Sequence, residues 1–193
     1  MLVLASASPR RQEILRNAGI PFLVKVPDVD ETPVAGESAQ ICAQRLARKK
    51  ASVVSQLRPN QIVLGADTIV VVDDRILGKP VDASDAQRML RLLSGRRHEV
   101  ITGDCLMING EAARSDESFV DVRFASTSVT MQPVNEDEIR AYIATGEPMD
   151  KAGAYAIQGI ASRWISRIEG DYFNVVGLPV SLVFRMLQER GGI

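Results

Sequence analysis

The sequence has few of the residues that ligate soft metals, form disulfides or act as histidine bases. Its 193 residues include two cysteines and one histidine. Cys42 and Cys105 stand far apart and form no CxxC pair, which excludes a zinc ribbon and favours a reducing compartment. His98 alone cannot build a histidine-rich metal site, it argues against a Ser-His-Asp array, and its simplest interpretation is a satisfied strand residue. Any metal would therefore have oxygen ligands, which indicates Mg²⁺ or Mn²⁺.

Long apolar runs, blocks of one charge and two common catalytic motifs are also absent. No apolar segment approaches the length of a membrane span, and the short apolar run at the start has no basic stretch before it, unlike a signal peptide. The formal net charge is −1 without an extended basic block, which argues against a nucleic-acid partner. Neither a P-loop nor a G-x-S-x-G elbow occurs. We therefore expect a soluble, cytoplasmic protein that binds neither membranes nor nucleic acid.

The order of predicted elements favours an α/β fold. Strands and helices alternate in the first half and the middle is rich in hairpins, which favours a mixed sheet over a purely parallel one. We expect strands at residues 2–5, 22–26, 61–72, 75–80, 98–107, 118–130 and 163–168. We expect helices after residues 8, 38, 82, 135 and 178, and turns at Asp73-Asp74, Asn109-Gly110 and Gly170-Asp171-Tyr172. The length suits one domain over residues 1–193, or two small lobes that share a cleft.

The first eleven residues predict a phosphate site. Residues 2–5 form an apolar strand, Ser6 and Ser8 supply hydroxyl groups, and Ser8 with Pro9 begins a helix. Arg10 and Arg11 then lie in the first helical turn, where free N–H groups and the helix dipole already create positive potential. Two arginines cost stability there unless an anion binds. The alternative is a pair of solvated arginines on a surface turn.

Lys50 faces the core side of its predicted helix. It is four residues after Leu46 and three before Val53, on the stripe that also contains Ala39, Ala43 and Leu57. A lysine facing inward needs a charge partner or a ligand, and the alternative is that its ammonium group reaches the edge of the core.

Asp67 interrupts an otherwise apolar β run, which is costly unless the carboxylate is paired, bound to metal or placed at a cleft. The alternative is a turn at a strand end, against which the continuing β run argues. Glu31 in the acidic loop, Lys79 on a Gly-Lys-Pro turn and Lys151 beside a small-residue loop are weaker candidates. Together these cations and carboxylates suit a polyphosphate held through a divalent metal.

In their order along the chain, these residues and their neighbours resemble the Maf family. Each block alone is weak, but the ordered set covers nearly the whole chain and is specific. The blocks are Ser6-Ala7-Ser8-Pro9-Arg10-Arg11, Asp30-Glu31, Leu46-Ala47 with Lys50-Ala51, Gly65-Ala66-Asp67-Thr68, Gly78-Lys79-Pro80, Thr145-Gly146-Glu147-Pro148, residues 150–159, Gly170-Asp171-Tyr172 and residues 174–179.

The resemblance implies an activity, a fold and partners. The activity is that of a nucleoside triphosphate pyrophosphatase, which cleaves the α–β phosphoanhydride bond to give a nucleoside monophosphate and pyrophosphate. The fold is an elongated, two-lobed α/β domain with a mixed central sheet flanked by helices, related to inosine triphosphate pyrophosphatases (Maf/Ham1). A homodimer and a divalent metal, Mg²⁺ or Mn²⁺, are also implied.

The resemblance further implies roles for individual residues. Asp67 matches the family's proposed general base, which could also act through the metal. The matching phosphate positions are Ser8, Arg10, Arg11, Lys50 and Lys79, and the matching metal positions are Glu31 and Asp67. Arg10, Thr68 and Gln158 match the branch that hydrolyses dTTP and UTP, whereas an aromatic residue, a Gln and a Glu are expected in the 7-methyl-GTP branch.

Two other functions stay open at this point. One is pyrophosphate release from 7-methyl-GTP or from nucleotides with modified bases. The other is a regulator of cell division that senses a nucleotide without hydrolysing it. The acidic set of Asp67 and Glu31 with Lys50 argues for turnover, because a protein that only binds would not need it.

Overall fold

The computed structural model of the protein describes residues 1–109 and 118–191. Its strands are β1 Leu2–Ala5, β2 Phe22–Val24, β3 Val63–Val72, β4 Arg75–Leu77, β5 Arg97–Ile108, β6 Phe119–Met131 and β7 Ile165–Glu169. Its α-helices are α1 Pro9–Asn17, α2 Ala39–Leu57, α3 Ala83–Leu93, α4 Glu136–Ala144, α5 Tyr172–Val176 and α6 Val180–Glu189. Three short 3₁₀ helices follow α4: η1 Glu147–Asp150, η2 Ala152–Ala154 and η3 Ile160–Trp164.

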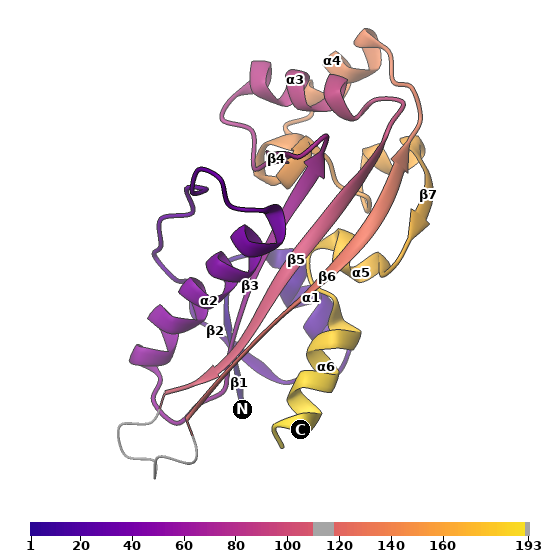
Figure 1. The fold of residues 1–193 in the computed structure, drawn as a ribbon. Helices are drawn as coiled ribbons and strands as arrows, with labels where there is room; N and C mark the ends of the chain where they lie inside the picture. Colours follow the sequence, from indigo (N-terminus) through magenta and orange to yellow (C-terminus); the bar gives the residue numbers. More distant parts are fainter. Residues whose placement is uncertain (110–117, 192–193) are drawn as a thin grey trace. The chain divides into compact units, whose positions relative to one another are not determined.

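The strands form a mixed sheet, which confirms the predicted fold class. The strand order is β2-β1-β3-β5-β6-β7, and β4 pairs with β3 outside this path (Figure 1). β1 is parallel to both β2 and β3, whereas β4 is antiparallel to β3 and β7 is antiparallel to β6. The parallel pairs join strands near the start of the chain. The antiparallel pairs join β4 to β3 through a tight turn, and β7 to β6 across α4 and the 3₁₀ helices.

The chain divides into two compact units, and β3, β5 and β6 contribute residues to both. Unit 1 comprises Met1–Asp67, Thr102–Ala125 and Gly177–Ile193. Unit 2 comprises Thr68–Ile101 and Ser126–Val176.

In unit 1, two glycines let α2 approach the strands closely. A Cβ atom on Gly65 of β3 would lie 2.2 Å from the backbone oxygen of Ala47, and one on Gly103 of β5 would lie 2.5 Å from that of Ala43. A side chain at either glycine would therefore push α2 away. The small residues Ala47 and Ala51 of α2 pack with strand residues in one buried cluster, and Figure 1 shows α2 beside β1 and β3.

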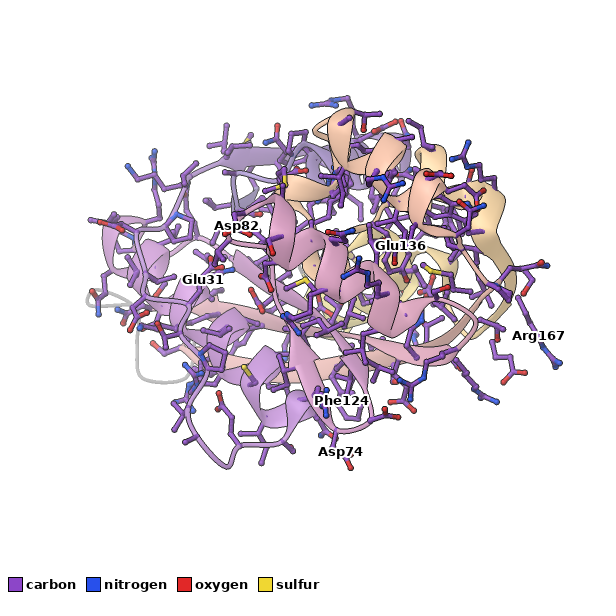
Figure 2. The ribbon with its side chains drawn as sticks, turned by 90° about the horizontal axis from the view of Figure 1, so that it is seen from above. Glu31, Asp74, Asp82, Phe124, Glu136 and Arg167 are labelled. Atoms are coloured by element: carbon purple, nitrogen blue, oxygen red, sulfur yellow. The ribbon has the colours of Figure 1, made fainter. Side chains whose placement is uncertain are left out.

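Capping hydrogen bonds confirm four of the five predicted helix starts, and the fifth helix, α6, begins at Val180 without a side-chain cap. Ser8 accepts from the backbone N–H of Arg11, and Ser38 accepts from that of Ile41. Asp82, labelled in Figure 2, caps α3. The Asn135 side chain accepts from the Glu138 N–H and the Glu138 carboxylate accepts from the Asn135 N–H, which is a complete capping box. These helix starts can be predicted from the sequence because each capping side chain bonds the backbone N–H only three residues later.

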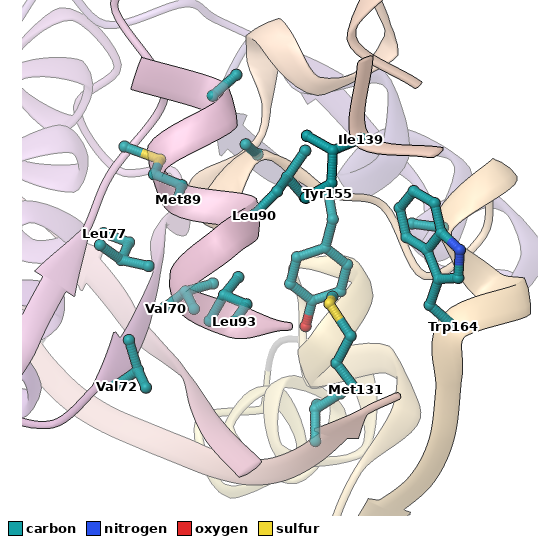
Figure 3. Packing of buried hydrophobic residues seen from close by; sticks show 14 of the residues in the cluster. Val70, Val72, Leu77, Met89, Leu90, Leu93, Met131, Ile139, Tyr155 and Trp164 are labelled. Carbon is teal, nitrogen blue, oxygen red and sulfur yellow. The ribbon is translucent and has the colours of Figure 1, made fainter. Parts of the chain in front are cut away.

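Unit 2 has its own apolar core, shown in Figure 3. Val70, Leu90, Leu93, Met131 and Tyr155 belong to this cluster of buried side chains. The small-residue loop after α4 enters this core, because Gly153 and Ala154 are buried. The backbone N–H of Gly153 donates to the carbonyl of Gly78, so the loop is also bonded to the segment after β4.

The structure corrects the expected burial of Leu57 and one of the predicted turns. Leu57 was predicted on the buried stripe of α2 but is 59% exposed, because the buried face centres on the alanines that approach the strands. The predicted turn at Gly170-Asp171-Tyr172 passes into α5, where the Asp171 carboxylate accepts from the backbone N–H of Phe173. The turn at Asp73-Asp74 is confirmed, with positive φ at both residues. The turn predicted at Asn109-Gly110 extends outside the described residues.

Among the described residues, no helix is both long enough and apolar enough to cross a membrane.

The burial of His98 should make the free energy of unfolding fall at acidic pH. Its Nε2 lies 2.7 Å from the Tyr155 hydroxyl, and burial lowers the pKa of the imidazole from 6.5 to about 4. The imidazole therefore takes up a proton more readily in the unfolded chain than in the folded protein. Neutral His98 contributes fully to the free energy of unfolding above pH 6.5, and this contribution is lost as the pH falls to 4. We expect a loss of up to about 3 kcal/mol over that interval.

Urea unfolding of the wild type and of His98→Gln at several pH values isolates this contribution from that of the carboxylates. The wild type should lose more unfolding free energy than the variant between pH 6.5 and pH 4. Parallel curves for the two proteins would show that His98 has no such role.

Candidate functional site

Lys50 joins two carboxylates in unit 1. Its Nζ lies 2.6 Å from Asp67 Oδ1 and 2.8 Å from Glu31 Oε1. The side chains of Lys50 and Asp67 are only 8% and 9% exposed, whereas that of Glu31 is 46% exposed. Lys50 is therefore a buried, ion-paired residue and does not reach out to solvent. Asp67 lies inside β3 and not at a strand end, as the β run after it predicts.

The approach of α2 to β3 produces this contact. Asp67 is two residues after Gly65, so both face the same side of the strand. Gly65 faces α2 at Ala47 and Ala51, and Lys50 is next to Ala51 on the same helix. Close packing at a glycine thus brings a lysine of the helix onto a carboxylate of the strand.

The acidic loop that carries Glu31 is fixed to α2 by two other basic side chains. Lys49 Nζ donates to the carbonyl of Asp30 at 2.9 Å, and Arg45 donates to the carbonyl of Thr32 at 3.2 Å. The Asp30 carboxylate also accepts from the backbone N–H and the hydroxyl of Thr32. Because the residues on both sides of Glu31 are held, its carboxylate is directed toward Lys50.

The N-terminus of α1 is built around Arg11. The buried Arg11 side chain donates from Nε to the carbonyl of Gly177 at 2.8 Å and from a terminal nitrogen to the Ser6 hydroxyl at 3.1 Å. Ser6 also accepts from the backbone N–H of Ser8, and Ser8 caps the helix. Arg10 is half-exposed next to Arg11. The alternative of two solvated arginines is therefore wrong for Arg11.

Electrostatics link Arg11 to the carboxylates around Lys50. Burial lowers the pKa of the Arg11 guanidinium, because a buried cation loses its hydration. Three negative charges act in the opposite direction: Asp67, Asp104 and Glu31. The predicted phosphate-binding helix and the Lys50–Asp67 pair therefore share one electrostatic environment within unit 1. This environment combines fixed cations with carboxylates, as a site for a phosphate chain requires.

Asp104 is a member of this environment that the sequence interpretation missed. It is fully buried on β5, and its neighbour Gly103 faces α2, so Asp104 points to the opposite side of the strand. Its negative charge raises the pKa of Arg11. The available signal was the same as for Asp67: a carboxylate within an apolar strand, here preceding Cys105 and Leu106.

The remaining predicted site residues belong to unit 2. Lys79 is exposed and lies two residues after the end of β4. Thr68 is half-buried on β3, where it faces the side opposite to Asp67. Gln158 is exposed in a tight turn in which the backbone N–H of Gly159 donates to the carbonyl of Ala156.

The donor chemistry at Lys50 suits a hard divalent cation. Asp67 and Glu31 present carboxylate oxygens to the same ammonium group. The described residues contain no group of three or more His, Cys, Asp or Glu that could hold a metal ion. Magnesium in nucleotide enzymes usually takes one or two carboxylates, with phosphate oxygens and water completing its coordination. The pair of carboxylates fits that pattern and does not fit a dedicated protein cage.

The chain is similar to known proteins over nearly its whole length. The sequence model of the family described as "Maf-like protein" matches residues 1–190. A dTTP/UTP pyrophosphatase of Koribacter versatilis (strain Ellin345) is 53% identical over 191 residues, which cover 98% of this chain and 94% of that protein. A dTTP/UTP pyrophosphatase of Symbiobacterium thermophilum is also 53% identical, with the same two coverages. Among solved structures, a HAM1 protein from Coxiella burnetii is 18% identical and has a TM-score of 0.47, covering 97% of this chain and 98% of that one.

Proposed function

The chain belongs to the family of Maf-like proteins, and from this premise we propose that it is a nucleoside triphosphate pyrophosphatase acting on dTTP and UTP. The products are the nucleoside monophosphate and pyrophosphate. The observation that carries the proposal is the buried Lys50–Asp67 pair in the same electrostatic environment as Arg11. A carboxylate and fixed cations are what hydrolysis of a phosphoanhydride requires.

The site residues named above in unit 1 each have a role in the proposed reaction. Arg11 and Arg10, with the N–H groups at the start of α1, bind the phosphate chain and offset the charge that develops on the leaving pyrophosphate. Asp67 orients or deprotonates the water that attacks the α-phosphorus. Lys50 fixes the Asp67 carboxylate through their 2.6 Å contact. Lys79 of unit 2 and Ser8 are further phosphate ligands in this proposal.

We also propose that a divalent cation, Mg²⁺ or Mn²⁺, takes part. Glu31 and Asp67 would hold it, and the cation would neutralise part of the phosphate charge. The carboxylates that share Lys50 support this proposal. A homodimer in the cytoplasm completes the proposal. The family resemblance supports the dimer, and the two free cysteines support a reducing compartment.

Gln158 selects the base in this account. The edge of thymine or uracil presents two carbonyl acceptors on either side of one N–H donor. The Gln158 amide has both a donor and an acceptor and can pair with that edge in either orientation, whereas an ionised Glu only accepts and would suit the donor-rich edge of guanine. Arg10 and Thr68 are the other proposed specificity positions, and Thr68 acts by shaping β3, since it faces away from Asp67.

Pyrophosphate release from dTTP, UTP, CTP, GTP and 7-methyl-GTP tests the substrate assignment. The wild type should prefer dTTP and UTP. Gln158→Glu should reduce hydrolysis of those two by about tenfold relative to 7-methyl-GTP. A factor of that size corresponds to roughly the free energy of one hydrogen bond. A wild type that hydrolyses 7-methyl-GTP best, or a variant with an unchanged substrate ranking, would overturn the assignment of the base.

A further inference from the structure

The loop that carries Gln158 is fixed in the core of unit 2 at both ends. Tyr155 before Gln158 and Trp164 after it both belong to the buried cluster of Figure 3. The hydroxyl of Tyr155 lies 2.7 Å from Nε2 of the buried His98. The Trp164 ring meets the ring of Tyr142 edge to face, with centroids 5.2 Å apart. These anchors fix the ends of the loop, but the exposed residues Gln158 and Ile160 between them depend on other contacts.

Two side chains outside the loop hold its middle. The Glu147 carboxylate accepts from the backbone N–H of Ile160 at 3.2 Å and from the Tyr142 hydroxyl at 2.9 Å. The Tyr142 oxygen in turn accepts from the backbone N–H of Ala156 at 3.3 Å. Ala156 is two residues before Gln158 and Ile160 is two residues after it. One connected pair, Glu147 and Tyr142, therefore holds both sides of the turn that presents Gln158.

Gly159 allows the carboxylate to lie against the loop. A Cβ atom at this position would be 2.1 Å from Glu147 Oε1 and 2.5 Å from its carboxyl carbon. Glu147 itself is held at its backbone: its N–H donates to the Thr145 hydroxyl and its carbonyl accepts from Lys151 Nζ at 2.7 Å. The carboxylate is therefore a fixed support for the turn, and the loop has a glycine where the two meet.

We propose that Glu147, together with Tyr142, is a positioning residue for base recognition, because it holds the turn that presents the Gln158 amide. The inference rests on the proposed function, in which Gln158 selects dTTP and UTP. A recognition amide discriminates bases only when its direction is fixed, since a mobile amide adapts to several hydrogen-bonding edges. Burial, followed by the Glu147 contact, raises the pKa of Tyr142, so the hydroxyl keeps its proton and can donate to the carboxylate.

Glu147→Ala removes the shared acceptor and should relax base selection. We expect the preference for dTTP over CTP, measured as the ratio of their kcat/KM values, to fall by about tenfold. KM for dTTP should rise, whereas kcat should change little, because the proposed chemistry lies in unit 1. Gly159→Ala should act in the same direction, since its methyl group displaces the carboxylate. Glu147→Gln keeps one acceptor oxygen and should retain most of the preference.

Glu138→Ala is the matched control in the same unit. The Glu138 carboxylate accepts from Trp164 Nε1 at 3.3 Å and caps α4, so it supports the far end of the same segment without bonding residues 156–160. This variant should lower the melting temperature and leave the dTTP/CTP ratio unchanged. A similar fall in the ratio for Glu138→Ala would mean that general loosening of unit 2 is responsible, and it would overturn the inference.

A double-mutant cycle with Gln158→Ala gives the decisive readout. If Glu147 acts through Gln158, Glu147→Ala should lower the dTTP/CTP ratio in the wild type and leave it unchanged in the Gln158→Ala background. If Gln158→Ala lowers the ratio but Glu147→Ala and Gly159→Ala, folded as judged by thermal melting, do not, the inference fails and the proposed function stands. If Gln158→Ala leaves the ratio unchanged, base reading by Gln158 and this inference fail together.

Discussion

Asp67→Asn should lower kcat for dTTP hydrolysis by at least ~10²-fold while the protein stays folded. Loss of general-base assistance normally costs that much, and the amide can neither accept the water's proton nor contribute a negative charge to a metal site. The fold should persist because Asn is close in size to Asp and because Lys50 keeps its 2.8 Å contact with Glu31. Nucleotide binding should therefore remain measurable by titration calorimetry.

Asp121→Asn is a matched control for this substitution. The Asp121 carboxylate is also 9% exposed and also pairs with basic side chains of unit 1, Arg123 and Arg190. Its loss should reduce stability, because removing one partner of a buried ion pair leaves the other charge uncompensated. It should change kcat by no more than about twofold, because Asp121 is not one of the proposed site residues. If Asp67→Asn retained a rate within about tenfold of the wild type, Asp67 would be neither a base nor a metal ligand.

Gly65→Ala should damage both stability and activity. The added methyl group would lie 2.2 Å from the Ala47 carbonyl oxygen and 2.7 Å from the Ala51 nitrogen, and neither backbone atom can move without α2. Overpacking of this kind costs about 1–3 kcal/mol or more, which corresponds to a fall in melting temperature of roughly 2–12 °C for a protein of this size. Displacement of Lys50 from Asp67 should lower kcat by up to ~10²-fold.

Gly78→Ala is the control for the melting experiment, because a Cβ atom there has no neighbour within 4 Å and the backbone has no positive φ. It should melt close to the wild type. If Gly65→Ala melted and reacted like the wild type, close packing of α2 on β3 would not be what holds Lys50 on Asp67.

The sequence was most informative where a polar residue breaks a regular apolar pattern. Lys50 interrupts a helical stripe and Asp67 interrupts a strand, and the structure brings these two residues into contact. The start of α1 was readable for a different reason: Ser8, Pro9 and the first-turn arginines lie within four residues of one another, so local rules apply.

Contacts between distant segments could not be read from the same patterns. Glu31 lies in a loop without periodicity, and its position depends on Lys49 and Arg45 holding the backbone around it. Asp104 had a readable signal, but its importance depends on the charge of Arg11, which only the folded chain brings near. Glu147 likewise gains its role from Gly159, twelve residues later, because the close approach of the two is a tertiary contact.

Hydrolysis of dTTP in water enriched in ¹⁸O tests the central claim most directly. If Asp67 directs water to the α-phosphorus, the products should be thymidine monophosphate and pyrophosphate, with the label in the monophosphate and none in the pyrophosphate. Mass spectrometry of the separated products gives the answer in one experiment, and Asp67→Asn should abolish the labelled product. Label in pyrophosphate, release of inorganic phosphate with thymidine diphosphate, or binding of dTTP without turnover would contradict the account.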